Sequence, residues 1–301
     1  MYRTFDSEMK RLFGTKVWKL SLDGGMTCPN RDGKVGFGGC VFCAGGGRFV
    51  PDAASDTEMQ IRCAKEILGE KARNSGFLAY FQSGTNTYAP VSKLRNLFFP
   101  LMLREDILGM SIGTRPDCLG DEVCGLLDEL GKIKPLWVEL GLQTSNDETA
   151  LRINRGYNCE VFDRAMEKLA PLSLNRVVHV IIGLPGETEE DVYKTVSHVA
   201  AFRPEGIKFH LLHVLRGTEL EKMRDRGEVE AISLEKYAEI VSECIRLIPP
   251  QTVVHRITGD GDKRLLIAPK WSADKKRVLN TLNRALEGVV QGEKFSEVVE
   301  K

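Results

Sequence analysis

Three cysteines near the start of the chain have the spacing of metal ligands. In DGGMTCPNRDGKVGFGGCVFCAGGG, eleven residues separate Cys28 from Cys40, and two separate Cys40 from Cys43. Thiolates are the usual ligands of iron-sulfur clusters, and a C-x-x-C pair can place two sulfurs on one cluster. Three thiolates on a four-iron four-sulfur cluster leave one iron open to a substrate or cofactor. The alternatives are a zinc knuckle with a distant fourth ligand, or a glycine-rich loop that happens to contain cysteines.

Polar residues that end or interrupt apolar runs form a second group of candidates. Small or amide residues follow one such run: Gln82, Ser83 and Gly84. They could hydrogen-bond a ligand or form an ordinary polar turn. Arg115 could bind a carboxylate bidentately or simply pair with Asp117. Glu139 interrupts an apolar run and needs a partner, since an unpaired buried carboxylate costs several kcal/mol; a structural pair with a Lys or Arg of a neighbouring strand would satisfy it.

The elements that must position these residues read as repeated β-α units, because short apolar runs alternate with amphipathic stretches. The candidate strands are Lys16–Leu22, Phe77–Gln82, Ile107–Ile112, Leu136–Leu142, Val177–Ile182 and Ile207–Val214. The candidate helices are Asp56–Arg73, Val91–Leu103, Asp121–Leu130, Cys159–Leu169, Thr188–Phe202 and Ser233–Leu247. Strands this apolar are buried on both faces, as in parallel sheets. The sequence therefore predicts an α/β fold with a partial or full parallel barrel, whose site lies at the strand ends.

The end of the chain follows a different pattern. After Pro249 and Pro250 comes a seventh possible strand, TVVHRI, then a charged loop and a terminal helix. We expect residues 1–250 to form the barrel core with its N-terminal segment. Residues 251–301 would form a small C-terminal extension in possible contact with RNA or substrate.

Composition narrows the function classes. The 301 residues are 42% hydrophobic, enough for a sizeable core, and 42 Lys and Arg balance 42 Asp and Glu. Because the formal net charge is zero, no overall electrostatic attraction to nucleic acid or membrane is expected, and an RNA site must be a local basic patch. The N-terminus lacks the apolar stretch of a signal peptide, and no segment has the length of a membrane span, so we expect a cytoplasmic protein. Eight cysteines are too sparse for a disulfide scaffold.

The motifs jointly resemble those of radical S-adenosylmethionine (SAM) enzymes, of the Elongator-like bacterial YhcC/YtqA type. The resemblance covers almost the whole chain, through TCPNRDG, GGCVFC, FQSGTNTYAP, SIGTRPDCL, residues 139–156, HVIIGLPGE and HRITGDG. The eleven residues between the first two cysteines depart from the three found in most of the superfamily. They are similar to the spacing in the radical SAM domain of the Elongator catalytic subunit.

The resemblance implies a partial parallel (β/α)6 radical SAM barrel with a small C-terminal extension. It implies a 4Fe-4S cluster on Cys28, Cys40 and Cys43, and reductive cleavage of S-adenosyl-L-methionine to methionine and a 5′-deoxyadenosyl radical. The residues expected to bind SAM are Gln82, Ser83, Gly84, Thr114, Arg115, Glu139, Gln143, Arg155, Gly183 and Leu184. A solvated salt bridge is the alternative for Arg155. Lys208 and His210 share one face of a strand and are the candidate substrate or proton-relay groups, although a satisfied core histidine is at least as common.

The resemblance also indicates a substrate, the C5 side chain of wobble uridine in tRNA, and an external one-electron donor such as flavodoxin or ferredoxin. The basic residues that could contact RNA are Arg3, Lys10, Arg11, Lys16, Lys19, Arg256, Lys263, Arg264, Lys270, Lys275, Lys276 and Arg277, with Trp271 as a stacking platform. They could equally form a solvated helix face. A radical SAM enzyme on a small molecule or protein, and a noncatalytic metal-binding protein, are the alternative functions. The other cysteines, at 63, 118, 124, 159 and 244, are expected to be small apolar residues.

Overall fold

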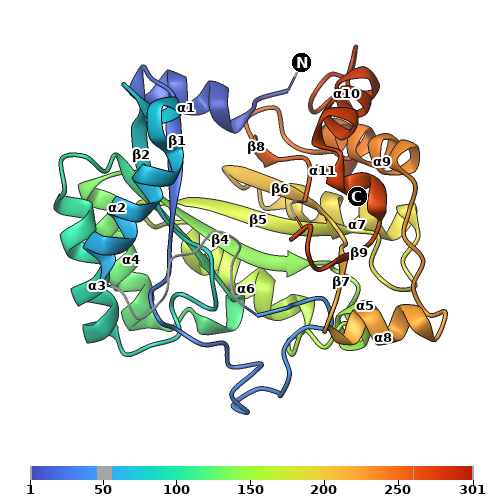
Figure 1. Ribbon diagram of the computed structural model, residues 1–301, viewed down its shortest axis with the longest axis horizontal. Helices are drawn as coiled ribbons and strands as arrows, with labels where there is room; N and C mark the ends of the chain where they lie inside the picture. Colours follow the sequence, from blue (N-terminus) through green and yellow to red (C-terminus); the bar gives the residue numbers. More distant parts are fainter. Residues whose placement is uncertain (1, 46–55, 260, 300–301) are drawn as a thin grey trace.

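The computed structural model describes residues 2–45, 56–259 and 261–299, and its centre is a parallel sheet that curls into a half-barrel (Figure 1). Listed from edge to edge, the strands are β1 (Val17–Leu22), β2 (Gly76–Phe81), β3 (Gly109–Thr114), β4 (Leu136–Gln143), β5 (Asn175–Ile182), β6 (Gly206–Leu211) and β8 (Val253–Arg256). Every neighbouring pair is parallel. The predicted α/β fold with a partial parallel barrel is confirmed. The possible seventh strand is the last strand of the sheet.

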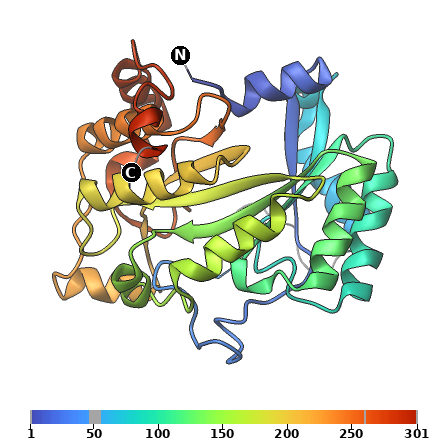
Figure 2. The ribbon, with the colours of Figure 1, turned by 180° about the vertical axis from the view of Figure 1, so that it is seen from behind.

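Helices cover the outer face of the sheet, as Figures 1 and 2 show from opposite sides. Their bounds are α1 (Phe5–Phe13), α2 (Thr57–Leu68), α3 (Val91–Leu103), α4 (Asp121–Ile133), α5 (Asp147–Arg152), α6 (Cys159–Leu169), α7 (Glu189–Ala201), α8 (Glu219–Asp225), α9 (Leu234–Leu247), α10 (Lys275–Ala285) and α11 (Phe295–Val299). At the start of several helices, an N-cap side chain accepts a hydrogen bond from a backbone N–H of the first turn, as Asp56 does at α2 and Thr188 at α7. The predictions for α3 and α6 are correct to the residue.

Alternation along each strand separates the core from the barrel interior. Outward residues such as Leu20, Phe81, Ile112, Val138 and Val180 are completely buried in the main core beneath the helices. The residues between them point into the barrel, because successive side chains of a strand face opposite sides. This inward face carries the polar side chains of the site.

Helix α1 closes the end of the barrel at which the strands begin. Met9 is buried in one apolar cluster with inward residues of four strands: Val17, Leu78, Trp137 and Val177. The segment before α1 reaches the other edge of the sheet, where Thr4 forms a bridge to Val254 of β8. The interior is therefore apolar at this end and open at the opposite one.

The C-terminal residues pack against helices and a strand that precede residue 250. Helix α10 packs on α9, α11 packs on α7 and α9, and β9 (Leu266–Ala268) pairs antiparallel with β7 (Val214–Leu215). A domain boundary between residues 250 and 251 stays a prediction, and residue 260 of the HRITGDG motif lies outside the described residues. In the described part of the chain, every helix is too short or too polar to cross a bilayer.

Candidate functional site

A cavity of about 470 Å³ opens where the central strands end, and it brings together most of the predicted site. The predicted residues that line it are Cys28, Cys40, Cys43, Gln82, Ser83, Gly84, Thr114, Arg115, Glu139, Gln143 and Arg155. They come from the segments that follow β1 to β4, together with residues of β3 and β4 themselves. The carboxyl ends of parallel strands meet at one edge of the sheet, which is why residues so far apart in sequence share one cavity.

The cysteine segment folds into tight turns above β1. The backbone N–H of Cys43 donates to the carbonyl of Cys40 (2.9 Å), and Arg31 Nη2 donates to the Cys43 carbonyl (2.6 Å). The side chain of Asn30 donates to the carbonyl of Asn154, so the loop is anchored to the segment after α5. Burial and the neighbouring Cys43 raise the pKa of the Cys40 thiol to about 11. These bonds fix the backbone of Cys40 and Cys43, and all three cysteines line the cavity.

The carboxylate of Glu139 is the centre of a buried polar network inside the barrel. It accepts hydrogen bonds from side chains on five strands: Lys19 (2.9 Å), Tyr80 (3.1 Å), Ser111 (2.6 Å), His179 (3.0 Å) and Lys208 (2.5 Å). Burial by itself would raise the pKa of Glu139, but the positive charges of Lys19 and Lys208 outweigh it and hold the pKa well below its ordinary value. The partner that the sequence analysis required is therefore a pair of lysines, and contact of Glu139 with SAM stays a prediction.

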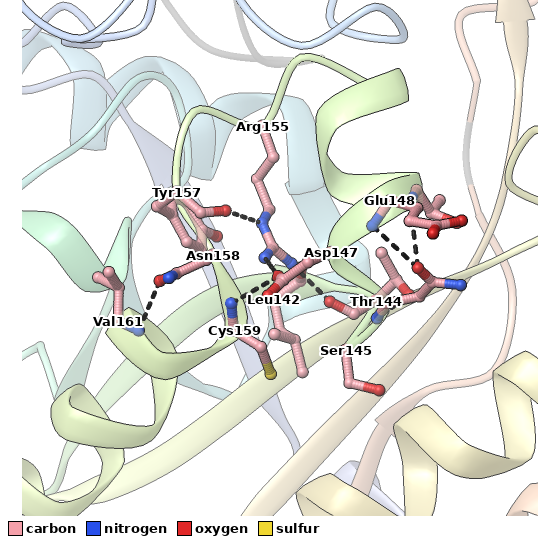
Figure 3. Close-up of polar contacts among 12 residues, drawn as sticks. Leu142, Thr144, Ser145, Asp147, Glu148, Arg155, Tyr157, Asn158, Cys159 and Val161 are labelled. Carbon is pink, nitrogen blue, oxygen red and sulfur yellow. Dashed lines mark hydrogen bonds and ion pairs between the residues drawn. The ribbon is translucent and has the colours of Figure 1, made fainter.

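Arg155 is completely buried, and its guanidinium donates hydrogen bonds to backbone carbonyls (Figure 3). Nε donates to the carbonyl of Tyr157 (2.9 Å), and Nη1 donates to those of Leu142 (2.8 Å) and Thr144 (2.5 Å). Nη2 lies 3.3 Å from the carboxylate of Asp147. A solvated salt bridge, the alternative interpretation for this arginine, does not describe it. In this state Arg155 holds the end of β4 against the loops around α5.

Arg115 is buried and pairs with Asp117, as one of its two interpretations predicted. Nε and Nη2 contact the two carboxylate oxygens of Asp117 at 2.9 and 2.7 Å. Nη1 donates to the carbonyl of Arg155 (2.9 Å), so the two arginines form one connected support for the cavity wall. A role for either arginine in binding SAM stays a prediction.

Two features of the cavity wall fit a bound polar group. Gln143 has a left-handed backbone (φ 67°) at an irregularity between β4 and β5, and its buried Oε1 has no hydrogen-bond partner among the described residues. Gly84 also has a left-handed backbone (φ 70°), and a Cβ there would lie 2.4 Å from the carbonyl oxygen of Met26. Backbone strain and an unpaired buried acceptor are typical of ligand sites. A ligand that brings amine or hydroxyl donors, as SAM does, would satisfy Gln143.

Four predicted residues do not line this cavity. Lys208 lies behind it, bonded to Glu139 and to the hydroxyl of Tyr80 (3.1 Å). His210 is half-buried next to His179, with 4.9 Å between ring centroids, and its buried Nε2 has no hydrogen-bond partner in the described part of the chain. Gly183 and Leu184 lie beyond the end of β5. Gly183 lines a separate, smaller pocket, and Leu184 packs in a second apolar cluster. The roles of all four stay predictions.

The lining residues that sequence reasoning missed include Tyr80, Tyr157 and His179. A usable signal existed for two of them. Tyr80 lies two residues before Gln82, and His179 lies on the strand paired with that of Glu139. The two-residue period of strands would have placed both on the inward face. Tyr157 had no such signal, because the loop after α5 brings it to the cavity.

The basic residues considered for RNA separate into two groups. Lys19 is bonded to Glu139 inside the barrel and is not available to RNA, which corrects that prediction. Trp271 packs at the edge of the core and donates its Nε1–H to the carbonyl of Ile232 (3.0 Å), and stacking of its ring on a base stays a prediction. The cations of α10 remain at the surface. Lys276, Arg277 and Arg284 line a hollow of about 390 Å³.

Comparison with known proteins finds similarity over almost the whole chain. The family model of the radical SAM superfamily matches residues 28–199, and that of the radical SAM C-terminal domain matches residues 204–288. The protein YtqA of Bacillus subtilis (strain 168) is 42% identical over 304 residues, which span 100% of this chain and 94% of YtqA. The tRNA uridine(34) acetyltransferase of Methanocaldococcus jannaschii is 30% identical over 156 residues, 51% of this chain and 28% of that protein.

Among solved structures, the archaeal Elp3 of Methanocaldococcus infernus with an N-terminal deletion superposes with a TM-score of 0.67 at 19% identity. The superposition covers 93% of this chain and 67% of that chain. At this level of identity the likeness concerns the fold. It agrees with the curled parallel sheet described above.

Proposed function

This chain belongs to the radical SAM superfamily, and we propose that it modifies the C5 side chain of the wobble uridine of a tRNA. The family makes it a radical SAM enzyme, which implies SAM and a 4Fe-4S cluster as cofactors. When bound, these cofactors supply one-electron reductive cleavage of SAM and, with it, abstraction of a hydrogen atom from the substrate. The remaining parts of the proposal concern which residues hold the cofactors and which molecule is modified.

We assign the cluster to the sulfurs of Cys28, Cys40 and Cys43. All three line one cavity, and three thiolates leave the open iron that SAM requires. The unpaired Oε1 of Gln143 and the close backbone at Gly84 lie in the same cavity and support a site for the polar ends of SAM. Glu139 and Arg155 also line this cavity, and their hydrogen bonds fix the strand ends that shape it.

The choice of tRNA is supported by a relative and by the surface of α10. The observation that carries it is the 30% identity, over half of this chain, with a protein named as a tRNA uridine(34) acetyltransferase. The cations of α10 offer a surface for a phosphate backbone. A base can enter a barrel only if it is unstacked, so the substrate would be a single-stranded or flipped nucleotide.

Nucleoside mass spectrometry of tRNA tests the substrate. Cells that lack the gene should lose one modified uridine at the wobble position, and the wild-type gene should restore it. The Cys40→Ala variant should not restore it, whereas Cys63→Ala, a change in helix α2 away from the cavity, should do so. Unchanged nucleosides would exclude the proposed substrate and direct attention to a small molecule or a protein.

Cluster assembly and SAM cleavage test the cofactor site separately. Anaerobically reconstituted wild-type protein should show a brown cluster absorbance and release 5′-deoxyadenosine from SAM with a reductant. Cys40→Ala and Cys43→Ala should abolish both signals and leave the far-UV circular dichroism close to that of wild type. A variant that keeps its cluster would refute the assignment of these ligands.

A further inference from the structure

Outside the cavity, one group of side chains has the composition of a metal site. Cys159 and Asp163 are one helical turn apart on α6, and His198 faces them from α7. His198 Nε2 lies 2.6 Å from Asp163 Oδ1 and 3.4 Å from Cys159 Sγ, and the sulfur lies 4.0 Å from the same Oδ1. Within the described residues this is the group of His, Cys, Asp and Glu side chains whose ligand atoms converge.

From this geometry we propose that Cys159, Asp163 and His198 bind a zinc ion that joins α6 to α7. Ideal zinc bonds of about 2.3 Å to sulfur and about 2.0 Å to nitrogen and oxygen imply tetrahedral ligand separations of about 3.3 to 3.6 Å. The three observed separations lie within about 0.7 Å of those values. Small side-chain rotations would therefore bring all three atoms onto one ion.

Hydrogen bonding alone accounts poorly for the arrangement. Both Cys159 and Asp163 approach the same ring nitrogen of His198, and one imidazole nitrogen has a single in-plane bonding direction. A catalytic Cys-His-Asp relay would place the two partners on opposite nitrogens of the ring. Convergence on one nitrogen instead fits ligands that share a metal.

The surrounding structure helps to position two of the three ligands, Cys159 and His198. The backbone N–H of Cys159 donates to Asp147 (2.7 Å), and in the view of Figure 3 its sulfur points away from Arg155. The His198 ring packs against Phe162 and Phe202, with centroid distances of 6.3 and 5.6 Å. Ring packing and a fixed helix start leave little freedom to lose when a metal binds.

The ligand types favour zinc over magnesium, calcium and an iron-sulfur cluster. One thiolate and one imidazole disfavour magnesium and calcium, which prefer oxygen ligands. One sulfur is too few for an iron-sulfur cluster. The side chains of His198 and Asp163 are 33% and 31% exposed, so a water molecule can take the fourth position.

Metal binding by a full-length chain without the cluster cysteines tests the site. In the C28S/C40S/C43S background, equilibrium dialysis against buffered zinc should give one zinc per chain. His198→Ala or Cys159→Ser should weaken zinc binding by at least about tenfold. The matched control Cys63→Ser, which removes a half-buried cysteine of α2, should change nothing.

Cobalt(II) identifies the ligand directly. The background protein should show a sulfur-to-cobalt charge-transfer band and tetrahedral ligand-field bands, which Cys159→Ser removes and Cys63→Ser keeps. Should Cys159→Ser fail to fold, His198→Gln in the same assay replaces it. Less than one bound zinc, or full binding by the His198 and Cys159 variants, would overturn the proposal. Since these measurements use protein without a cluster, their outcome is independent of the proposed tRNA modification.

Discussion

Replacing Glu139 by Gln is the sharpest test of how the barrel interior is built. The carboxylate balances two lysines, Lys19 at 2.9 Å and Lys208 at 2.5 Å, and its side chain is completely buried. Glutamine keeps the shape but removes the charge. Its NH₂ group would also face side chains that donate to the carboxylate in the wild type.

The expected cost follows from the chemistry of buried ion pairs. Removing one partner and leaving a buried charge uncompensated costs about 3–5 kcal/mol, so the free energy of unfolding should fall by about that amount. An exposed pair gives the matched control. Glu129→Gln removes the partner of Arg95, both about half exposed, and should cost no more than about 1 kcal/mol. Adding Lys208→Met to Glu139→Gln should recover part of the loss, because the remaining charge has one fewer neighbour to repel.

Urea unfolding of cluster-free protein, followed by circular dichroism, measures these differences. The pH dependence adds a second readout. Since the folded pKa of Glu139 is depressed, its contribution is present above its unfolded pKa of about 4.3 and is lost as the pH falls through the folded value. The difference in free energy of unfolding between wild type and Glu139→Gln should therefore become smaller below about pH 4. If the free energy of unfolding of Glu139→Gln lies within about 1 kcal/mol of that of wild type at neutral pH, the buried ion pairs of Glu139 do not stabilise the fold as expected.

Three further predictions concern the cavity wall. Gln143→Gly should leave the stability unchanged or raise it, because it relieves about 1 kcal/mol of left-handed backbone strain. The same variant should bind SAM more weakly in calorimetry. Equal affinity for SAM would contradict the ligand role of Gln143. Gly84→Ala should destabilise by about 1–3 kcal/mol through its contact with backbone, whereas Gly125→Ala in α4, where a Cβ meets nothing within 4 Å, should stabilise the protein in thermal unfolding. Burial and the Lys208 charge lower the pKa of His179 to about 4. The free energy of unfolding of the wild type should thus fall by up to about 3 kcal/mol as the pH is lowered from 6.5 to 4. A His179→Asn variant whose free energy of unfolding falls equally over this range would contradict this.

Much of the fold was predictable because it depends on local pattern. The strands and helices follow from hydrophobic periodicity, and α3 and α6 were predicted to the residue. The meeting of the three cysteines with residues after β2, β3 and β4 was also predictable, whereas Gly183 and Leu184 after β5 lie outside the cavity. Residues that follow successive parallel strands must meet at one edge of the sheet.

The roles of single residues were not predictable in this way. Lys19 reads as one of several surface cations in the sequence, and only the register of the sheet turns it inward toward Glu139. Arg155 reads as a ligand for SAM or a solvated ion pair, and the loops around α5 wrap its guanidinium in carbonyls.

The parallel α/β barrel and the grouping of three cysteines after its first strand could be predicted, because both depend on spacing along the chain. Packing between distant segments sets which charges are buried together and which cysteine faces which histidine. Cys159 was expected to be an ordinary apolar residue, and it became a candidate metal ligand only when α7 placed His198 beside it. Such partners are 39 residues apart in the chain, and no local pattern records a contact that packing between two helices creates.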